Sequence, residues 1–221
     1  MSRTVTGMEL VDLSHVIEHG MITYPGLPGP EVGVHLAFDE SHATYAEGTE
    51  FTIGRITMVA NTGTYLDTPA HRHREGWDTT GLRLEQCVDL PAVVVEGDRF
   101  GPGPFDGLDV AGKAVLLRSG WDRHWRTDRY GDPEHPFLDE AGAAHLVDAG
   151  VALVGIDSVN IDDTRGRERP AHTRLLAADI PIVEHLTGLD RLPVTGARFT
   201  AVPVKVAGMA TLPVRAFARL P

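Results

Sequence analysis

Two continuous apolar segments, residues 113–118 and 151–156, flank a stretch whose apolar residues recur at helical spacing. This stretch, residues 138–149, stops before Gly150, and glycine suits the position that follows a helix. Strands that are apolar throughout are typical of parallel pairs with both faces covered, and parallel strands need a crossover connection. The pattern predicts a strand–helix–strand unit and an α/β fold. Asp157 follows the second strand, at the kind of sheet edge where ligands gather.

Strand signals also occur on both sides of this unit. Residues 51–60 alternate apolar and polar side chains, which predicts a half-buried strand that runs into the following loop. Residues 97–107 are rich in glycine and proline and are interpreted as turns, and residues 171–179 as a short helix or turn. Further strands are predicted at residues 9–13, 91–96, 199–206 and 213–220. With more strand than helix and no linker, residues 1–221 are expected to form one domain.

Composition excludes several classes of function. The chain has 221 residues, 42% of them hydrophobic, and a formal net charge of −11, whereas a nucleic-acid-binding surface needs a basic face. No apolar run approaches membrane-spanning length, and residues 1–9 contain no apolar signal core. We therefore expect a cytoplasmic protein with neither nucleic acid nor membrane as a partner. Cys87, the only cysteine, lies among apolar residues and is expected to be a buried, inert thiol.

The loop at residues 61–71 reads NTGTYLDTPAH and combines several features of a functional site. Gly63 allows the backbone to approach a ligand closely, and Pro69 stiffens the loop. Asp67 and His71 pair a carboxylate with an imidazole, the combination that proteins use for divalent metals and for acid–base catalysis. The alternative is an ordinary turn, in which Asp67 caps local amides and His71 is exposed.

A second pair, His172 and Glu184, strengthens the functional interpretation. Glu184 lies inside the apolar run at residues 180–186, where a carboxylate is costly to bury unless it is paired or bound to a cation. The alternative is an ion pair with an arginine. The arginines that lie close in sequence are Arg165, Arg167, Arg169 and Arg174.

With these residues the chain resembles the bacterial cyclase family of metal-dependent hydrolases, which includes bacterial kynurenine formamidase and isatin hydrolase. The family signature is H-x-G-T-H-x-D-x-P-x-H, and residues 61–71 match it except at Asn61 and Tyr65, which replace its first two histidines. The similarity runs nearly from end to end. It includes residues 12–15, 23–26, 117–122, 182–184, 199–205 and 213–215.

The resemblance implies a fold, an assembly and a set of roles. The fold is a swivelling β/β/α domain with a mixed sheet and few helices, assembled as a homodimer or homotetramer. Asp67, His172 and Glu184 match metal ligands of the family, and His71 matches its base or proton shuttle. The other two ligand places are those of the missing histidines. The chain is thus a divergent member that keeps three of five expected ligands.

The loss of two imidazoles affects a zinc site most, because neutral imidazole suits zinc. Asn61 offers a carbonyl oxygen and Tyr65 a phenol, which must lose a proton to bind a metal well. The remaining oxygen-rich set fits Mn²⁺, Mg²⁺ or Ca²⁺ better than Zn²⁺. We expect a divalent ion, Mn²⁺ or Zn²⁺. The alternative is a site without metal, in which Asp67 and Glu184 repel one another and the pKa of one of them rises.

Three functions follow from this pattern. The first is a hydrolase or cyclase acting on a small cyclic or aromatic amide, imide, lactone or polyketide-like substrate, with His71 as acid/base and Tyr65 or Asn61 orienting the substrate. The second is a metal-independent cyclase or dehydratase that uses Tyr65, His71 and the carboxyl pair. The third is a non-catalytic ligand-binding protein. The retained Asp67, His172 and Glu184 favour the first function.

Overall fold

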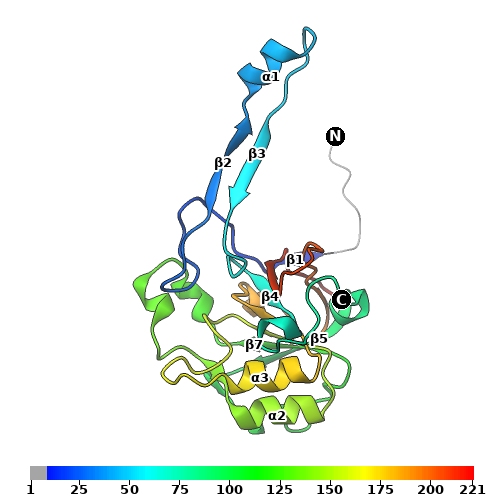
Figure 1. The fold of residues 1–221 in the computed structure, drawn as a ribbon. Helices are drawn as coiled ribbons and strands as arrows, with labels where there is room; N and C mark the ends of the chain where they lie inside the picture. Colours follow the sequence, from blue (N-terminus) through cyan, green and yellow to red (C-terminus); the bar gives the residue numbers. More distant parts are fainter. Residues whose placement is uncertain (1–8) are drawn as a thin grey trace.

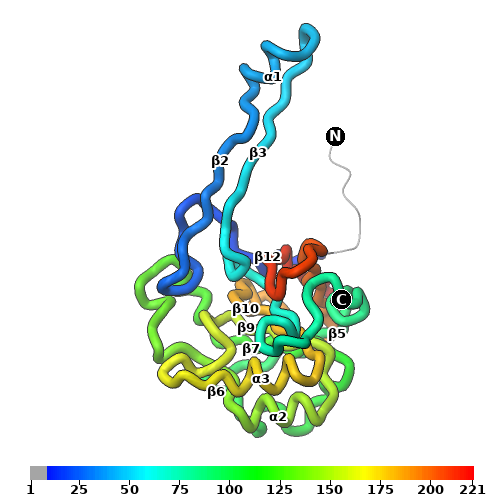
Figure 2. The backbone as a smooth tube through the Cα atoms, in the orientation of Figure 1, coloured from blue at the N-terminus to red at the C-terminus, as the bar shows by residue number. Residues whose placement is uncertain are grey.

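The computed structural model describes residues 9–221, and its centre is a mixed sheet (Figure 1; Figure 2). The nine strands lie in the order β1-β13-β11-β5-β7-β9-β10-β4-β12. Their bounds are β1 Leu10–Asp12, β4 Tyr65–Asp67, β5 Leu90–Glu96, β7 Ala114–Arg118, β9 Leu153–Ile156, β10 Ile182–Glu184, β11 Thr195–Thr200, β12 Thr211–Pro213 and β13 Phe217–Arg219. Strands β5, β7, β9 and β10 are parallel, and the outer pairs are antiparallel. The predicted swivelling β/β/α fold, a mixed sheet with few helices, is confirmed.

The predicted strand–helix–strand unit is present as β7, α2 (Glu140–Asp148) and β9. The side chain of Asp139 caps the start of α2 by accepting a hydrogen bond from the backbone N–H of Gly142 at 2.8 Å. Gly150 follows the helix with a φ of +70°, the left-handed conformation that glycine adopts without strain. A second crossover through α3 (Pro170–Ala177) leads to β10, and both helices cover one face of the sheet (Figure 1).

Burial on both faces explains the continuous apolar runs of the central strands. In β5, Val93 and Val95 belong to the core beneath the helices, whereas Ala92 and Val94 belong to the core on the opposite face. The side chains of β7 divide in the same alternating way. Successive side chains of a strand point to opposite faces, so a strand buried on both sides contains no polar position in its middle.

The prediction of a half-buried strand at residues 51–60 is wrong about its burial. Residues Ile53–Thr57 do form a strand, β3, but all its residues are exposed. It pairs with β2 (Glu31–Leu36) in a separate two-stranded sheet whose connection contains α1 (Phe38–Thr44). This segment, here called the arm (residues 31–57), projects away from the main sheet (Figure 1). An alternating pattern does not by itself show whether a strand is buried, and within the described part of the chain no layer covers either strand of the arm.

Three other boundaries differ from the sequence predictions. The strand predicted at 199–206 is β11, which begins earlier and ends at Thr200, and Pro203 makes only an isolated bridge. The strand predicted at 213–220 is divided into β12 and β13, which lie at opposite parts of the sheet. The turns predicted at 97–107 include the short strand β6 (Arg99–Phe100), paired with β8 (Phe137–Leu138).

Several smaller features complete the fold. The 3₁₀ helices are η1 Pro69–His71, η2 Leu84–Gln86, η3 Gly103–Phe105, η4 Trp121–His124, η5 Asp128–Gly131 and η6 Leu189–Arg191. Cys87 is buried as predicted, and burial raises the pKa of its thiol to about 11. Within residues 9–221, no helix has the length and apolar character needed to cross a bilayer. Residues 1–8, which contribute to the prediction that no signal core is present, lie outside the described part.

Replacing Gly142 with alanine is expected to destabilise the protein. A Cβ atom at this position would lie 2.2 Å from the carbonyl oxygen of Phe100 and 2.9 Å from Cδ1 of Leu138. Since α2 must shift away from β6 to relieve the overlap, Gly142→Ala should cost about 1–3 kcal/mol of unfolding free energy. Gly103→Ala is the control, because a Cβ there meets open space, and its effect should stay within about 0.5 kcal/mol. Equal effects of the two substitutions in urea unfolding would contradict this packing.

Candidate active site

The site forms where β4 lies between β10 and β12. In the antiparallel register, Tyr65 is opposite Glu184, and Asp67 is opposite Thr211. Side chains two residues apart on a strand share a face, so these four side chains point to the same side of the sheet. Helix α3 packs near β10 and η1 and supplies His172. The loop predicted at residues 61–71 therefore contains a strand of the main sheet, which the sequence analysis did not predict.

The structure brings the predicted acidic and imidazole groups together. Nε2 of His172 is 3.7 Å from Oδ2 of Asp67 and 3.6 Å from Oε1 of Glu184. Nδ1 of His71 is 3.5 Å from Oδ1 of Asp67. Asp67, His172 and Glu184 are buried, whereas the side chain of His71 is 34% exposed. His71 is thus the member of the group that a substrate from solution can reach.

A buried carboxylate, that of Asp162, orients His172. Its Oδ2 lies 2.6 Å from Nδ1 of His172, and its two oxygens accept the backbone N–H groups of Ala171 and His172 at 2.6 and 3.1 Å. The ring nitrogen that remains, Nε2, faces Asp67 and Glu184. Two atoms of the group, Nε2 of His172 and Oδ2 of Asp67, are buried and have no hydrogen-bond partner among residues 9–221.

Thr211 connects Asp67 to His71. Its hydroxyl contacts Oδ1 of Asp67 and lies 3.0 Å from Nδ1 of His71. An ionised carboxylate only accepts hydrogen bonds, so the single proton of Thr211 goes to Asp67 and its oxygen accepts from His71. In the neutral tautomer that fits this contact, the hydrogen of the His71 ring is on Nδ1. Nε2 then has a free lone pair, as a general base or a metal ligand requires.

Tyr65 acts as a hydrogen-bond donor to Glu184. Its hydroxyl donates to Oε2 of Glu184 at 2.7 Å, and Oε1 of Glu184 accepts the backbone N–H of Ile161 at 2.6 Å. Burial, together with the charges of Glu184 and Asp67, raises the pKa of Tyr65 well above its ordinary value. Tyr65 therefore remains a neutral phenol, which is a poor metal ligand. Asn61 is half-buried before β4, and its interaction with Tyr65 acts to lower that pKa.

The alternative in which an arginine neutralises Glu184 is wrong. Two of the nearby arginines form ion pairs at the surface, Arg165 with Asp163 and Arg174 with Glu140. Arg169 bonds to backbone carbonyl oxygens. The groups that face Glu184 are a phenol, a backbone amide and His172, so its burial depends on hydrogen bonds and a single imidazole.

The charges of the site shift one another's pKa values. Burial raises the pKa of Glu184 to about 7, against the opposing effect of His172. Burial acts to lower the pKa of His172, but Glu184, Asp162 and Asp67 outweigh it and raise that pKa to about 10. For Asp67, burial acts to raise the pKa, but His71 and His172 hold it below its ordinary value. The group thus attracts positive charge strongly.

The donor set fits a divalent metal ion. Asp67, His71 and His172 each offer a ligand atom, and these atoms lie within 4.8 Å of one another. The two unpartnered atoms belong to this set, and Asp162 binds the far nitrogen of His172 as a carboxylate commonly does behind a metal-ligating histidine. Carboxylate and imidazole together suit several divalent ions.

Two residues singled out from the sequence, Gly63 and Asp157, make close contacts within the protein. Gly63 has a φ of +66°, and a Cβ there would lie 3.0 Å from Cγ1 of Ile17, so the close approach is to the protein's own chain. Asp157, at the end of β9, accepts the backbone N–H groups of Ser119 and Gly120 and braces that turn.

Four contacts at or directly behind the site were missed by the sequence analysis. They involve Asp162, Thr211, Tyr130 and His185. An available signal was the position of His185, an imidazole directly after Glu184 inside an apolar run. Thr211 becomes recognisable only from the strand register, because nothing in its sequence neighbourhood marks it.

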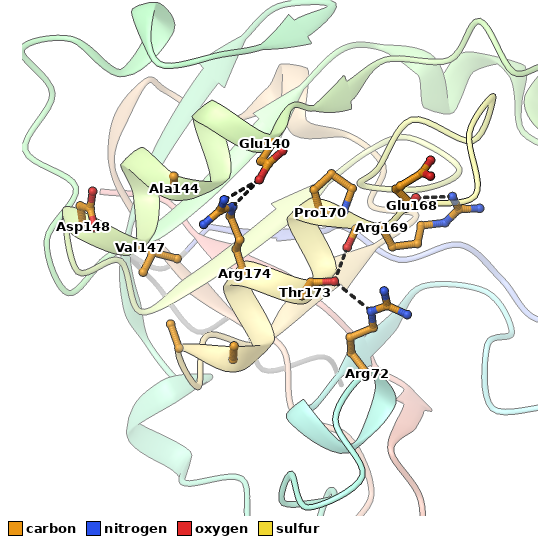
Figure 3. Close-up of a pocket in the computed structure, with 12 residues that line it drawn as sticks. Arg72, Glu140, Ala144, Val147, Asp148, Glu168, Arg169, Pro170, Thr173 and Arg174 are labelled. Carbon is orange, nitrogen blue, oxygen red and sulfur yellow. Dashed lines mark hydrogen bonds and ion pairs between the residues drawn. The ribbon is translucent and has the colours of Figure 1, made fainter.

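A cavity of about 860 Å³ lies beside the site, between α2, α3 and η1 (Figure 3). Arg72 and Thr173, the chain neighbours of His71 and His172, line it and bond to each other at 2.9 Å. Arg174 and Glu140 pair on another part of its wall (Figure 3). His71 and His172 themselves are not among its lining residues. The cavity is therefore adjacent to the candidate site and separate from it.

The comparisons with known proteins agree with this fold and site. The sequence profile of the cyclase family, described as "Putative cyclase", matches residues 11–163. A kynurenine formamidase from Geobacillus thermodenitrificans is 32% identical over 180 residues, which cover 79% of this chain and 83% of that protein. The chain therefore belongs to the cyclase family, as its sequence indicated, and is an enzyme.

Solved structures share the architecture. A potential metal-dependent hydrolase with cyclase activity superposes with a TM-score of 0.78 at 25% identity, covering 97% of this chain and 99% of that one. Isatin hydrolase A from Ralstonia solanacearum has a TM-score of 0.82 at 21% identity, covering 97% and 92%, and shows the shared fold. Together with the Asp67, His71 and His172 group, the likeness to a metal-dependent hydrolase points to a divalent metal.

Replacing Asp162 with asparagine is expected to lower the unfolding free energy of the metal-free protein by about 3 kcal/mol. The change removes the negative charge beside the buried His172 ring and leaves one backbone N–H without an acceptor. Asp163→Asn is the matched control. Asp163 is the next residue, but it lies at the surface in an ion pair with Arg165, so its loss should cost less than about 1 kcal/mol. Urea unfolding checks the difference, and similar midpoints for the two variants would contradict the role of Asp162.

Proposed function

We propose that this enzyme hydrolyses a small aromatic amide, either a formamide or a cyclic amide or imide. The observation that carries the proposal is the pair of unpartnered buried atoms, Oδ2 of Asp67 and Nε2 of His172, 3.7 Å apart beside the exposed His71. The relative named kynurenine formamidase supports an aromatic formamide as substrate. The aromatic substrate class rests on this relative, and the hydrolytic chemistry rests on the site.

We propose that Asp67 and His172 hold a divalent ion, with Glu184 completing the set from beside His172. Such an ion, Mn²⁺ or Zn²⁺, would supply Lewis acidity toward the carbonyl oxygen of the substrate. The set has two carboxylates, those of Asp67 and Glu184, and only one imidazole, that of His172. Such an oxygen-rich set of ligands favours Mn²⁺. The raised pKa of His172 means that the ion would bind in competition with a proton on that ring.

His71 is proposed as the acid/base. Its Nδ1 is bound by Thr211, so Nε2 is free to take a proton from the water that attacks the substrate carbonyl carbon. When the C–N bond breaks, the same nitrogen returns the proton to the departing amine. Tyr65 keeps its hydroxyl on Glu184, and Asn61, half-buried at the entry to β4, is left to orient the substrate.

A second candidate is acid–base catalysis without metal. The observation that favours it is a hydrogen bond of 2.7 Å from Tyr65, which replaces a signature histidine, to Glu184. This bond occupies one carboxylate oxygen of Glu184. Burial raises the pKa of Glu184 to about 7, so this carboxyl can carry a proton near neutral pH. Tyr65, His71 and Glu184 would then catalyse cyclisation or dehydration.

Metal content and turnover of a formylated kynurenine distinguish these proposals. The purified enzyme is expected to bind about one equivalent of Mn²⁺ or Zn²⁺ and to lose turnover with a chelator. Asp67→Asn and His172→Ala should lose both the metal and turnover. His71→Ala should keep the metal and lose about 10²–10⁴-fold in kcat, the usual contribution of a general base.

His145→Ala is the control, because His145 lies on α2 against Phe105, outside the site, and the variant should keep metal and turnover. Full activity in the presence of chelator would instead support the metal-independent candidate. Loss of metal from His71→Ala would make His71 a ligand and contradict its proposed role in proton transfer.

We further propose that the chain assembles as a homodimer or homotetramer through the arm. A two-stranded hairpin is marginally stable in water by itself, and the arm exposes large apolar side chains. They are Val32, Val34, Phe38, Tyr45, Ile53 and Ile56. Contact with a second copy of the chain would cover them and hold the arm in place.

Light scattering coupled to gel filtration tests this assembly. The wild-type chain should have the mass of a dimer or tetramer, and Val34→Lys should shift it toward the monomer, because a charge would then enter the interface. Val204→Lys is the control, since Val204 is 71% exposed and lies outside the arm, against 60% for Val34. A monomeric wild-type protein would contradict the proposal.

A further inference from the structure

Behind Tyr65 lies a buried chain of hydrogen-bonding groups that the proposed function does not use. The hydroxyl of Tyr65 is 3.2 Å from Nε2 of His185, and Nδ1 of His185 is 2.8 Å from the hydroxyl of Tyr130. All three residues are buried. With the bond from Tyr65 to Glu184, they form one continuous row that ends at the carboxylate beside His172.

Counting protons gives this row a single direction. Glu184, when ionised, can only accept, so Tyr65 donates its one proton to Oε2. The oxygen of Tyr65 can then only accept from Nε2 of His185, which must carry a hydrogen. A neutral imidazole has one N–H, so Nδ1 accepts from the hydroxyl of Tyr130. With Glu184 ionised and the ring of His185 neutral, each group therefore donates to the next in the order Tyr130, His185, Tyr65, Glu184.

The environment of His185 keeps its ring uncharged and fixed. Both nitrogens face phenols, so no carboxylate is bound to the ring. Its side chain is fully buried, and the ring lies 5.0 Å from that of Tyr65, 5.7 Å from that of Tyr130 and 5.8 Å from that of Trp125. Burial without a carboxylate partner disfavours the imidazolium.

The backbone at His185 is held in an uncommon conformation. Its φ is +56°, in the left-handed region that residues other than glycine seldom adopt. The hydroxyl of Thr64 donates to the carbonyl of His185 at 2.6 Å and helps to hold it there. Such conformations are unfavourable and occur where the surrounding structure fixes a functional group. Here the conformation places the imidazole behind Tyr65.

We propose that His185 is a positioning residue that acts on Glu184 through Tyr65. Tyr65 stands where the family signature has a histidine, and His185 supplies an imidazole one hydrogen bond further away. By donating from Nε2, His185 fixes the phenol so that its proton lies on Oε2, and Oε1 of Glu184 faces His172. The effect on catalysis rests on the proposed function, whereas the direction of the hydrogen bonds does not.

The tautomer of His185 tests the hydrogen-bond direction without any substrate. Long-range ¹H–¹⁵N NMR of the full-length, wild-type protein distinguishes protonated from unprotonated ring nitrogens, and the spectrum of His185→Gln identifies the signals that belong to His185. We expect hydrogen on Nε2 and none on Nδ1. A proton on Nδ1, alone or together with one on Nε2, would overturn the proposal.

Kinetics on the formylated substrate test the effect on catalysis. His185→Phe keeps a ring of similar size but no donor, and it should lower kcat about 10–100-fold, the usual effect of losing a group that orients a functional residue, with little change in KM. His185→Gln offers an amide N–H near the position of Nε2 and should restore most of kcat. Tyr65→Phe should match His185→Phe, and the double variant should lose no more than either single one.

Equal losses in folded His185→Phe and His185→Gln, or a wild-type kcat in folded His185→Phe, would overturn the positioning role. If the wild-type enzyme does not turn over aromatic amides, the proposed function fails. In that case the NMR result still decides the hydrogen-bond chain, and metal affinity of the same variants replaces kcat as the readout, with the same order expected for His185→Phe and His185→Gln.

Discussion

The site depends on the burial of three carboxylates around one imidazole. Asp67, Asp162 and Glu184 all lie in the interior within reach of His172. Like charges this close are unfavourable unless hydrogen-bond donors or cations balance them. Asp162 is balanced by His172 and two backbone amides, and Glu184 by Tyr65 and Ile161. Oδ2 of Asp67 remains without a partner, so the balance is incomplete where a cation fits.

The fold provides this arrangement through strand register and a helix. Strands β4, β10 and β12 bring four polar side chains to one face, and α3 places His172 above them. The same face continues into an apolar core beneath α2 and α3, which excludes water from the carboxylates. Burial is costly for each carboxylate taken alone. In this site it also strengthens the attraction for positive charge and shifts the pKa values of the buried groups.

The sequence predicted those parts of the molecule that depend on local patterns. The apolar runs of β7 and β9 and the helix between them were recognisable because burial on both faces leaves no polar position. Asp67, His71, His172 and Glu184 were recognisable from motif residues and from an acidic side chain in an apolar run. Asp162 and Thr211 were not, because their roles depend on contacts between distant segments. The exposure of the arm was missed because alternation describes a strand without saying what covers it.

Diffraction from crystals grown with Mn²⁺, with data collected at the manganese absorption edge, tests the central claim most directly. That claim is that the partnerless atoms of Asp67 and His172 form a cation site. It predicts an anomalous peak within bonding distance of Oδ2 of Asp67 and Nε2 of His172, next to His71, while Tyr65 keeps its hydrogen bond to Glu184. A map without a peak there, or with manganese bound only elsewhere, would contradict it.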